Sequence, residues 1–265
     1  MTAELTIVMP IFDGATQLDF TGPYQFFFRT PDVTVIVASM GGRKITANGL
    51  AFADLEDLRN IERCDVLCVP GGNCVSAMED NGFLDEIRRL AANATYLTSV
   101  CTGSLILGAA GLIVGKRAAC HWAWRHMLSL FGAIPDSGRV VRDGNVITGG
   151  GVTAGIDFAL TVIAELRGNE VAQGVQLGLE YAPTPPFEAG RPELAPPAVL
   201  ATTKNWLAPT LSENRPRMER IAAHLRDIQK LPASTDRTCC CSRARGPARA
   251  GCRRRRPKDW SVAWA

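Results

Sequence analysis

Short apolar runs alternate with segments of helical period along most of the chain. An apolar run closed by turn residues predicts a strand that is buried on both faces. The predicted strands are Leu5–Ile11, Val33–Ser39, Asp65–Val69, Tyr96–Val100, Arg139–Arg142 and Val146–Thr148. The predicted helices are Phe83–Ala92, Gly103–Ala110, Trp122–Phe131, Ala154–Leu166 and a helix opened by Thr21–Pro23, whose buried face is Tyr24–Phe28. This alternation predicts an α/β fold, a flavodoxin-like doubly wound, mostly parallel sheet with helices on both faces.

Turn residues and proline mark the remaining organisation of the chain. Asn48 and Gly49 inside Ile45–Phe52 predict a hairpin. The segment Ala182–Pro197 is rich in proline, which predicts an irregular arm. Two helical stretches follow this arm, Ala198–Leu207 and Glu213–Gln229.

The carboxyl ends of the predicted strands carry the residues that matter for ligand binding. Doubly wound sheets bind ligands at that edge. Cys101 follows one predicted strand, and Gly71 and Gly72 follow another. We therefore expect these residues to lie at the functional site.

Composition and charge divide the 265-residue chain into two parts. The whole chain is 46% hydrophobic with a mean hydropathy of +0.04, which excludes a disordered or collagen-like protein. Residues 232–265 contain nine basic and two acidic residues, a net charge of +7, whereas residues 1–231 contain 20 basic and 24 acidic residues, a net charge of −4. We expect one catalytic domain with a C-terminal helical extension in residues 1–231. The body lacks the basic field that nucleic-acid binding needs.

The basic, Cys- and Arg-rich segment 232–265 has neither apolar period nor turn pattern. We expect it to be disordered. A second hypothesis is read-through in a shifted reading frame, because its composition differs so strongly from that of the body.

Cysteine usage and apolar segments indicate a cytoplasmic protein that does not enter a membrane. Nine cysteines, an odd number, do not form a disulfide framework. The longest apolar stretch, Ser104–Gly115, is too short to cross a bilayer. Cys64, Cys68 and Cys74 do not have the spacing of a zinc site, so we interpret them as buried thiols and expect no metal.

The strongest chemical signal is the segment Ser99–Gly103, in which small residues flank Cys101 between a strand and a helix. This is the pattern of a nucleophile elbow, a sharp turn that exposes a nucleophile. The amides at the start of the following helix favour a thiolate there. A buried structural cysteine is the alternative.

A nucleophilic thiol needs a group that moves protons, and three residues are candidates. His121 fits either a Cys/His pair or a packing role, and His126 is expected at the surface. Asp19 lies at the start of the first predicted helix. It fits a helix cap and a catalytic acid equally well.

The sequence resembles the ThiJ/PfpI superfamily, which is class I glutamine amidotransferase-like, and within it the isocyanide hydratases. The segments that carry the resemblance are Leu18–Pro23, Val69–Gly72, Thr98–Ser104, Thr148–Asp157, Leu179–Pro183 and Pro185–Phe187. The resemblance implies that Cys101 is the nucleophile, Asp19 its acidic partner and Thr102 a hydrogen-bonding neighbour. It further implies that Gly72, Val152 and His121 bind substrate, that no cofactor is used, and that the protein is a homodimer.

The implied reaction converts an isocyanide, for example cyclohexyl isocyanide, and water to an N-substituted formamide. A thiolate adds to the terminal carbon while Asp19 protonates that carbon, which gives a thioimidate on Cys101, and water then releases the product. Two alternatives stay open. One is a ligand-sensing domain of a transcriptional regulator, although Glu213–Gln229 offers only one helix for a DNA-binding module. The other is a glyoxalase or deglycase, which usually has glutamate at the position of Asp19.

Overall fold

The computed structural model describes residues 4–230. Its main sheet has seven strands in the order β10-β11-β7-β6-β1-β2-β5. The strands are β1 (Leu5–Pro10), β2 (Val33–Ser39), β3 (Ile45–Ala47), β4 (Leu50–Phe52), β5 (Glu56–Asp57), β6 (Val66–Val69), β7 (Tyr96–Val100), β8 (Arg117–Ala118), β9 (Ile134–Pro135), β10 (Val140–Asp143) and β11 (Val146–Gly149). The helices are α1 (Gln17–Phe28), α2 (Val75–Glu79), α3 (Asn81–Ala91), α4 (Gly103–Ala109), α5 (Ala154–Arg167), α6 (Asn169–Gly178) and α7 (Pro197–Lys230), with 3-10 turns η1 (Met40–Gly42), η2 (Leu58–Asn60) and η3 (Arg125–Phe131).

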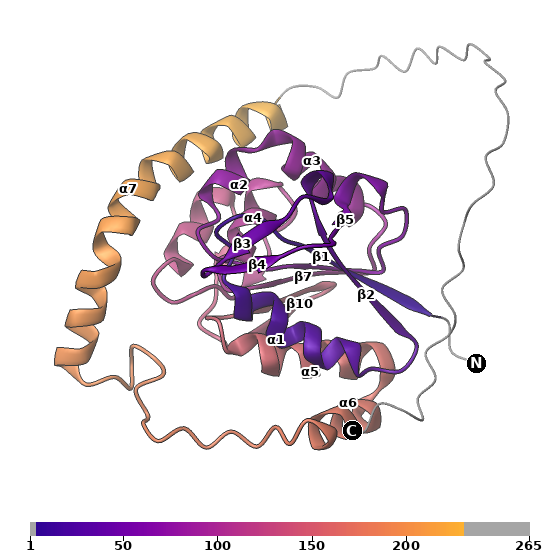
Figure 1. The fold of residues 1–265 in the computed structure, drawn as a ribbon. Coiled ribbons are helices and arrows are strands. Elements are labelled where there is room, and N and C mark those ends of the chain that lie inside the picture. The colour runs from indigo at the N-terminus through magenta and orange to yellow at the C-terminus, as the bar shows by residue number, and fades with distance from the viewer. Residues whose placement is uncertain (1–3, 231–265) are drawn as a thin grey trace, which may run out of the picture. The chain divides into compact units, whose positions relative to one another are not determined.

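Helices cover both faces of this sheet, with α1 and α5 on one face and α2 to α4 on the other (Figure 1). Neighbouring strands pair in parallel, except that β10 runs antiparallel to β11. The apolar run of β6 is fully buried as expected, whereas in β2 Thr34 is exposed and only Ala38 and Ser39 are fully buried. The predicted doubly wound α/β fold is confirmed.

The hairpin turn between β3 and β4 also forms as the sequence predicts. β3 and β4 pair antiparallel around Asn48 and Gly49, whose φ angles of 48° and 81° suit a two-residue hairpin turn. The hairpin is confirmed.

The structure corrects the start of the first helix. α1 begins at Gln17 and contains Pro23, whereas Thr21–Pro23 was expected to open it. Thr21 donates its hydroxyl to the carbonyl of Gln17, so a full turn already precedes the proline. A proline seven positions into a helix removes only one backbone hydrogen bond, and the helix continues through it.

The structure corrects the segment Trp122–Phe131 as well. It forms turns followed by the 3-10 helix η3, not an α-helix. Short elements that the sequence pattern did not indicate are α2, α6, β5, β8 and β9.

The C-terminal part of the body is a single helix of 34 residues. The two stretches that the sequence predicts are continuous in α7, which contains Pro209 and Pro216. Met218, Ala222 and Leu225 on α7 are buried, and the helix contacts α2, α4 and η3. The arm before it is irregular, as expected. The predictions for residues 232–265 lie outside the described residues.

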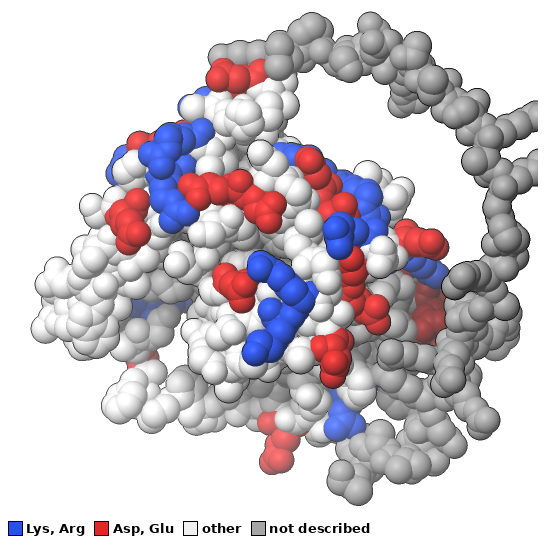
Figure 2. Space-filling view, turned by 45° about the horizontal axis from the view of Figure 1, so that its top comes forward, with Lys and Arg blue, Asp and Glu red and all other residues white. Residues whose placement is uncertain are grey.

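Charged side chains of both signs are interspersed over the face shown in Figure 2. Ion pairs among the described residues include Arg88–Asp85, Arg89–Glu86 and Arg217–Glu79. Such mixing is typical of a solvated surface. Within residues 4–230, every helix is too short or too polar to cross a membrane.

Candidate active site

Cys101 occupies a sharp turn between β7 and α4. Its φ angle is +60°, a left-handed conformation that a side chain other than glycine adopts only when its surroundings impose it. Its amide donates to the carbonyls of Gly149 and Gly150, at 3.1 and 2.8 Å. A Cβ atom at Gly103 would lie 2.1 Å from the carbonyl oxygen of Val69, so only glycine fits there. The predicted strand-to-helix turn is confirmed.

Asp19 is fully buried in the first turn of α1. Its Oδ2 accepts a hydrogen bond from the amide of Gly71 at 3.0 Å, and its Oδ1 has no hydrogen-bond partner among residues 4–230. The N-cap position of α1 is Thr16, so of the two roles that the sequence leaves open for Asp19, the helix cap is excluded. The carboxyl group instead faces the turn after β6, with one oxygen left for another partner.

Burial shifts the ionisation of this carboxyl group toward the protonated form. It raises the pKa of Asp19 from 3.8 to about 7, although the side chain of Cys101 and the amide of Gly71 act in the opposite direction. The shift is large because a charged carboxylate loses its hydration at this position.

The same burial raises the pKa of Cys101 well above 9, and the negative charge of Asp19 adds to this effect. The amides of Thr102 and Val152 lower it, as the elbow geometry predicts, but burial outweighs them. Burial therefore opposes the thiolate that these amides favour.

Thr102 joins the elbow to the turn after β6. Its hydroxyl donates to the carbonyl of Gly72 and accepts from the amide of Gly72, both at 2.8 Å. A Cβ atom on Gly71 would lie 2.5 Å from the amide nitrogen of Thr102 and 2.9 Å from Oδ2 of Asp19. The close packing of these two turns fixes the carboxyl group of Asp19 relative to the elbow.

A cavity of about 240 Å³, here called the Cys101 pocket, opens beside the thiol. It is lined by Thr16, Gly72, Asn73, Cys74, Val75, Cys101, Thr102, His121, Trp124, Val152, Leu207, Thr210, Asn214 and Met218. Five of the six site residues predicted from the sequence line it, and Asp19 is fully buried without lining it. The wall that α7 contributes was not predicted, because nothing in the sequence of α7 indicates which side faces a ligand.

His121 lines the Cys101 pocket and is half-buried. Its Nδ1 accepts from the amide of Ala123 at 3.3 Å, and burial lowers its pKa below 6.5. The ring is therefore neutral at pH 7. No hydrogen bond connects it to Cys101 among the described residues, whereas His126 is exposed as predicted.

The other cysteines of the body are buried free thiols, as the sequence indicates. Burial raises the pKa of Cys64 and Cys68 to about 12. Residues 4–230 contain no group of three or more His, Cys, Asp or Glu side chains that could hold a metal ion.

Comparisons with known proteins agree with this geometry. The model of the DJ-1/PfpI family matches residues 5–165. An isonitrile hydratase from Pseudomonas putida is 50% identical over 223 residues, which cover 83% of this chain and 98% of that protein. The crystal structure of a ThiJ/PfpI family protein from Pseudomonas syringae is 38% identical, with a TM-score of 0.78 over 83% of this chain and 91% of that one. The HTH-type transcriptional regulator CdhR from Pseudomonas aeruginosa is 28% identical over 141 residues, which cover 52% of this chain and 41% of the regulator.

Proposed function

The chain belongs to the DJ-1/PfpI family, as its sequence motifs predict, and from that premise we propose that it is an isocyanide hydratase. The reaction converts an isocyanide, R–N≡C, and water to the formamide R–NH–CHO. One observation carries the proposal. A thiol and a carboxyl group, Cys101 and Asp19, share a buried site in a chain that is 50% identical to an isonitrile hydratase.

Substrate binding uses the apolar walls of the Cys101 pocket. Val75, Val152, Leu207 and Met218 surround the space beside the thiol. An isocyanide group carries no charge. In cyclohexyl isocyanide the R group is compact and apolar. Burial of that group in the pocket supplies the binding free energy.

Addition of the thiol to the terminal carbon is the first chemical step. The carboxylate of Asp19 takes the proton of Cys101, and the thiolate sulfur forms a bond to the isocyanide carbon. Asp19 then delivers the proton to the same carbon, which gives the thioimidate R–N=CH–S on Cys101. A pKa of about 7 suits a group that both accepts and donates a proton at neutral pH.

Hydrolysis of the thioimidate is the second step. Asp19, again a carboxylate, takes a proton from water while the oxygen adds to the carbon. That proton passes to the nitrogen, and the C–S bond of the resulting R–NH–CH(OH)–S adduct breaks. The hydroxyl proton returns to the sulfur, so the formamide leaves and the thiol of Cys101 is restored.

One assay tests the proposal against the glyoxalase alternative. The purified protein is incubated with cyclohexyl isocyanide or with methylglyoxal, and products are identified by mass spectrometry. We expect N-cyclohexylformamide from the first and no turnover of the second. We expect Cys101→Ala and Cys101→Ser to fold with unchanged circular dichroism and to lose turnover. Turnover above trace level in both variants would exclude Cys101 as the nucleophile.

The similarity to the regulator CdhR supports a second candidate, a domain that binds an isocyanide or related ligand without converting it. The same assay separates the two functions. A sensor binds the ligand, detectable by calorimetry, and forms no formamide.

We further propose a cytoplasmic homodimer. The five cysteines of residues 4–230 are free, which suits a reducing compartment. Several large apolar side chains are exposed in one stretch of the chain: Leu177, Phe187, Leu194, Val199 and Trp206. Large exposed apolar side chains support an interface where they form a contiguous patch. Sedimentation equilibrium tests the dimer, and a monomer at micromolar concentration would contradict it.

A further inference from the structure

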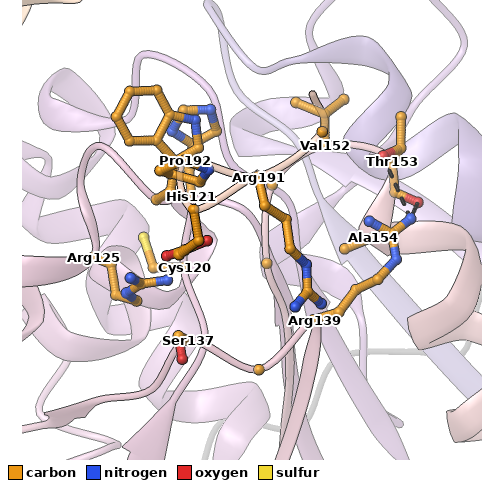
Figure 3. Close-up of a pocket in the computed structure, with 16 residues that line it drawn as sticks. Cys120, His121, Arg125, Ser137, Arg139, Val152, Thr153, Ala154, Arg191 and Pro192 are labelled. Carbon is orange, nitrogen blue, oxygen red and sulfur yellow. Dashed lines mark hydrogen bonds between the residues drawn. The ribbon is translucent and has the colours of Figure 1, made fainter. Parts of the chain in front are cut away.

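A second cavity shares part of its lining with the Cys101 pocket. Figure 3 shows the residues that line this second cavity. Its volume is about 220 Å³, and it shares His121 and Val152 with the Cys101 pocket. We call it the arginine cavity, because Arg125, Arg139 and Arg191 line it. His121 and Val152 therefore border both cavities.

The three arginines come from separate segments of the chain. Arg125 begins η3, Arg139 precedes β10, and Arg191 lies in the irregular arm before α7. The amide of Arg125 donates to the carbonyl of His121, which connects this arginine directly to the wall of the Cys101 pocket. Cationic side chains that line one cavity from distant segments favour the binding of an anion.

Arg139 already has partners. Its Nε donates to Oδ2 of Asp157 and its Nη2 to the carbonyl of Thr153, the latter contact drawn in Figure 3. The hydroxyl of Tyr181 donates to the other oxygen of Asp157 at 3.0 Å. Asp157 therefore neutralises Arg139 and holds it in place.

Arg125 and Arg191 differ in this respect. Neither has a carboxylate within 4 Å among residues 4–230. Glu193 is the one acidic side chain in the wall of the cavity, so an excess positive charge remains. This occurs in a body whose net charge is −4. The N-terminus of α5, a helix of 14 residues, adds its positive dipole end at Ala154.

We propose that the arginine cavity binds a carboxylate on the R group of the substrate, so that the preferred substrates are isocyano carboxylates. This inference rests on the proposed function. The isocyanide carbon lies at Cys101, the linker passes His121 and Val152, and the carboxylate lies between Arg125 and Arg191. Guanidinium groups pair with carboxylates through two parallel hydrogen bonds, which favours this anion over a point charge.

The inference gives the proline-rich arm a role. Residues 190–193 of the arm form one side of the arginine cavity. Prolines restrict the backbone, so Arg191 reaches its position at a lower entropic cost than in a flexible loop. The arm then sets substrate specificity without taking part in the chemistry.

A matched pair of substrates tests this specificity. The probes are 6-isocyanohexanoate and its uncharged methyl ester, and kcat/KM is measured for each. We expect kcat/KM to be about tenfold higher for the acid than for the ester, because the KM of the acid is lower. A tenfold change is the usual effect of one charge-assisted contact. In 0.5 M NaCl the advantage should shrink. Equal values for acid and ester would overturn the proposal.

Substitutions locate the effect. Arg125→Gln and Arg191→Gln should each raise KM for the acid about tenfold and leave the ester unchanged. Arg191 is exposed, so its loss does not threaten folding. Arg215→Gln is the control, because Arg215 lies outside both cavities and pairs with Glu219. An equal effect of the control would mean that the charge of the whole molecule, not the cavity, attracts the acid.

A binding measurement separates this inference from the proposed function. Calorimetry on the Cys101→Ala variant compares 6-formamidohexanoate with its methyl ester and needs no turnover. Tighter binding of the acid that is lost on Arg191→Gln supports the arginine cavity, even if neither isocyanide is hydrated. Equal affinity for both ligands overturns the inference, even if hydration proceeds.

Discussion

Burial raises the pKa of both Asp19 and Cys101, and the negative charge of Asp19 raises that of Cys101 further, whereas the hydrogen bond from the side chain of Cys101 lowers the pKa of Asp19. One proton shared between them serves the proposed reaction, since the isocyanide carbon must receive a proton while sulfur attacks it. The unpartnered Oδ1 of Asp19 is the place for a further hydrogen bond. A full thiolate at rest is not required.

The pH dependence of activity follows from this shared proton. Below pH 7 the pair holds two protons, and Asp19 cannot accept the proton of Cys101. We therefore expect kcat/KM to rise with pH through an apparent pKa of about 7 and then to level off. Asp19→Asn should remove this rising limb and lower the rate about a hundredfold, the usual range for general acid/base catalysis.

Mass spectrometry of the Asp19→Asn variant with substrate locates the defect. If no adduct forms on Cys101, the variant fails to protonate the isocyanide carbon during addition. If the thioimidate accumulates, the variant fails to activate the water that hydrolyses it. Near-normal turnover of this variant would contradict the role of Asp19 and transfer proton movement to His121 or solvent.

The same carboxyl group makes stability depend on pH. Its pKa is higher in the folded chain, about 7, than the ordinary value of 3.8, so the folded state binds the proton more tightly. This contribution to stability is complete below the unfolded pKa and is lost as the pH rises through 7. The Asp19→Asn variant has no titrating group at this position, so its stability does not change with pH for this reason. We expect the free energy of unfolding of the variant, relative to the parent, to increase by about 3 kcal/mol between pH 5 and pH 8.

Urea unfolding at the two pH values measures this difference. A constant difference would mean that the carboxyl group of Asp19 ionises normally in the folded protein. Asp13→Asn, a change at a side chain that is about half exposed, serves as the control for the loss of a carboxyl group outside the site.

At the scale of elements, the apolar runs predict the sheet well because a buried parallel strand has a distinctive composition. The boundaries of helices are harder to predict from the sequence. Pro23 in α1 and Pro209 in α7 resemble helix breaks, yet both helices continue through these prolines. The role of Asp19 was ambiguous for the same reason, since its partner Gly71 is 52 residues away in the sequence. Contacts of that separation have no local signature.

The turn after β6 gives a steric prediction. Gly71→Ala places a methyl group within 3 Å of Thr102 and Asp19, where no shift of a flexible side chain can relieve the contact. We expect a lower melting temperature and a loss of activity of at least a hundredfold. Thermal unfolding and the isocyanide assay measure both.

Gly174→Ala is the matched control, because a Cβ atom there meets no neighbour within 4 Å. Gly174 is an exposed residue inside α6, so alanine should stabilise the helix by about 0.5–1 kcal/mol and leave activity unchanged. Activity of Gly71→Ala equal to that of this control would show that the two turns are not tightly coupled.

At the scale of the whole molecule, both cavities are built entirely from residues 16–218. The acidic body therefore contains every group that the proposed reaction uses. We expect deletion of residues 232–265 to leave kcat and KM unchanged. A large loss of activity in the folded, truncated protein would show that this segment contributes to the site.

The helix α7 connects activity to the order in which the chain is made. Leu207, Thr210, Asn214 and Met218 form one wall of the Cys101 pocket, although the elbow and the carbonyls of Gly149 and Gly150 that it binds lie more than fifty residues earlier. During synthesis the thiol is therefore in place well before the wall that encloses it. A nascent or prematurely terminated chain presents Cys101 to water and to cellular electrophiles, and the full substrate pocket exists only once translation has passed α7.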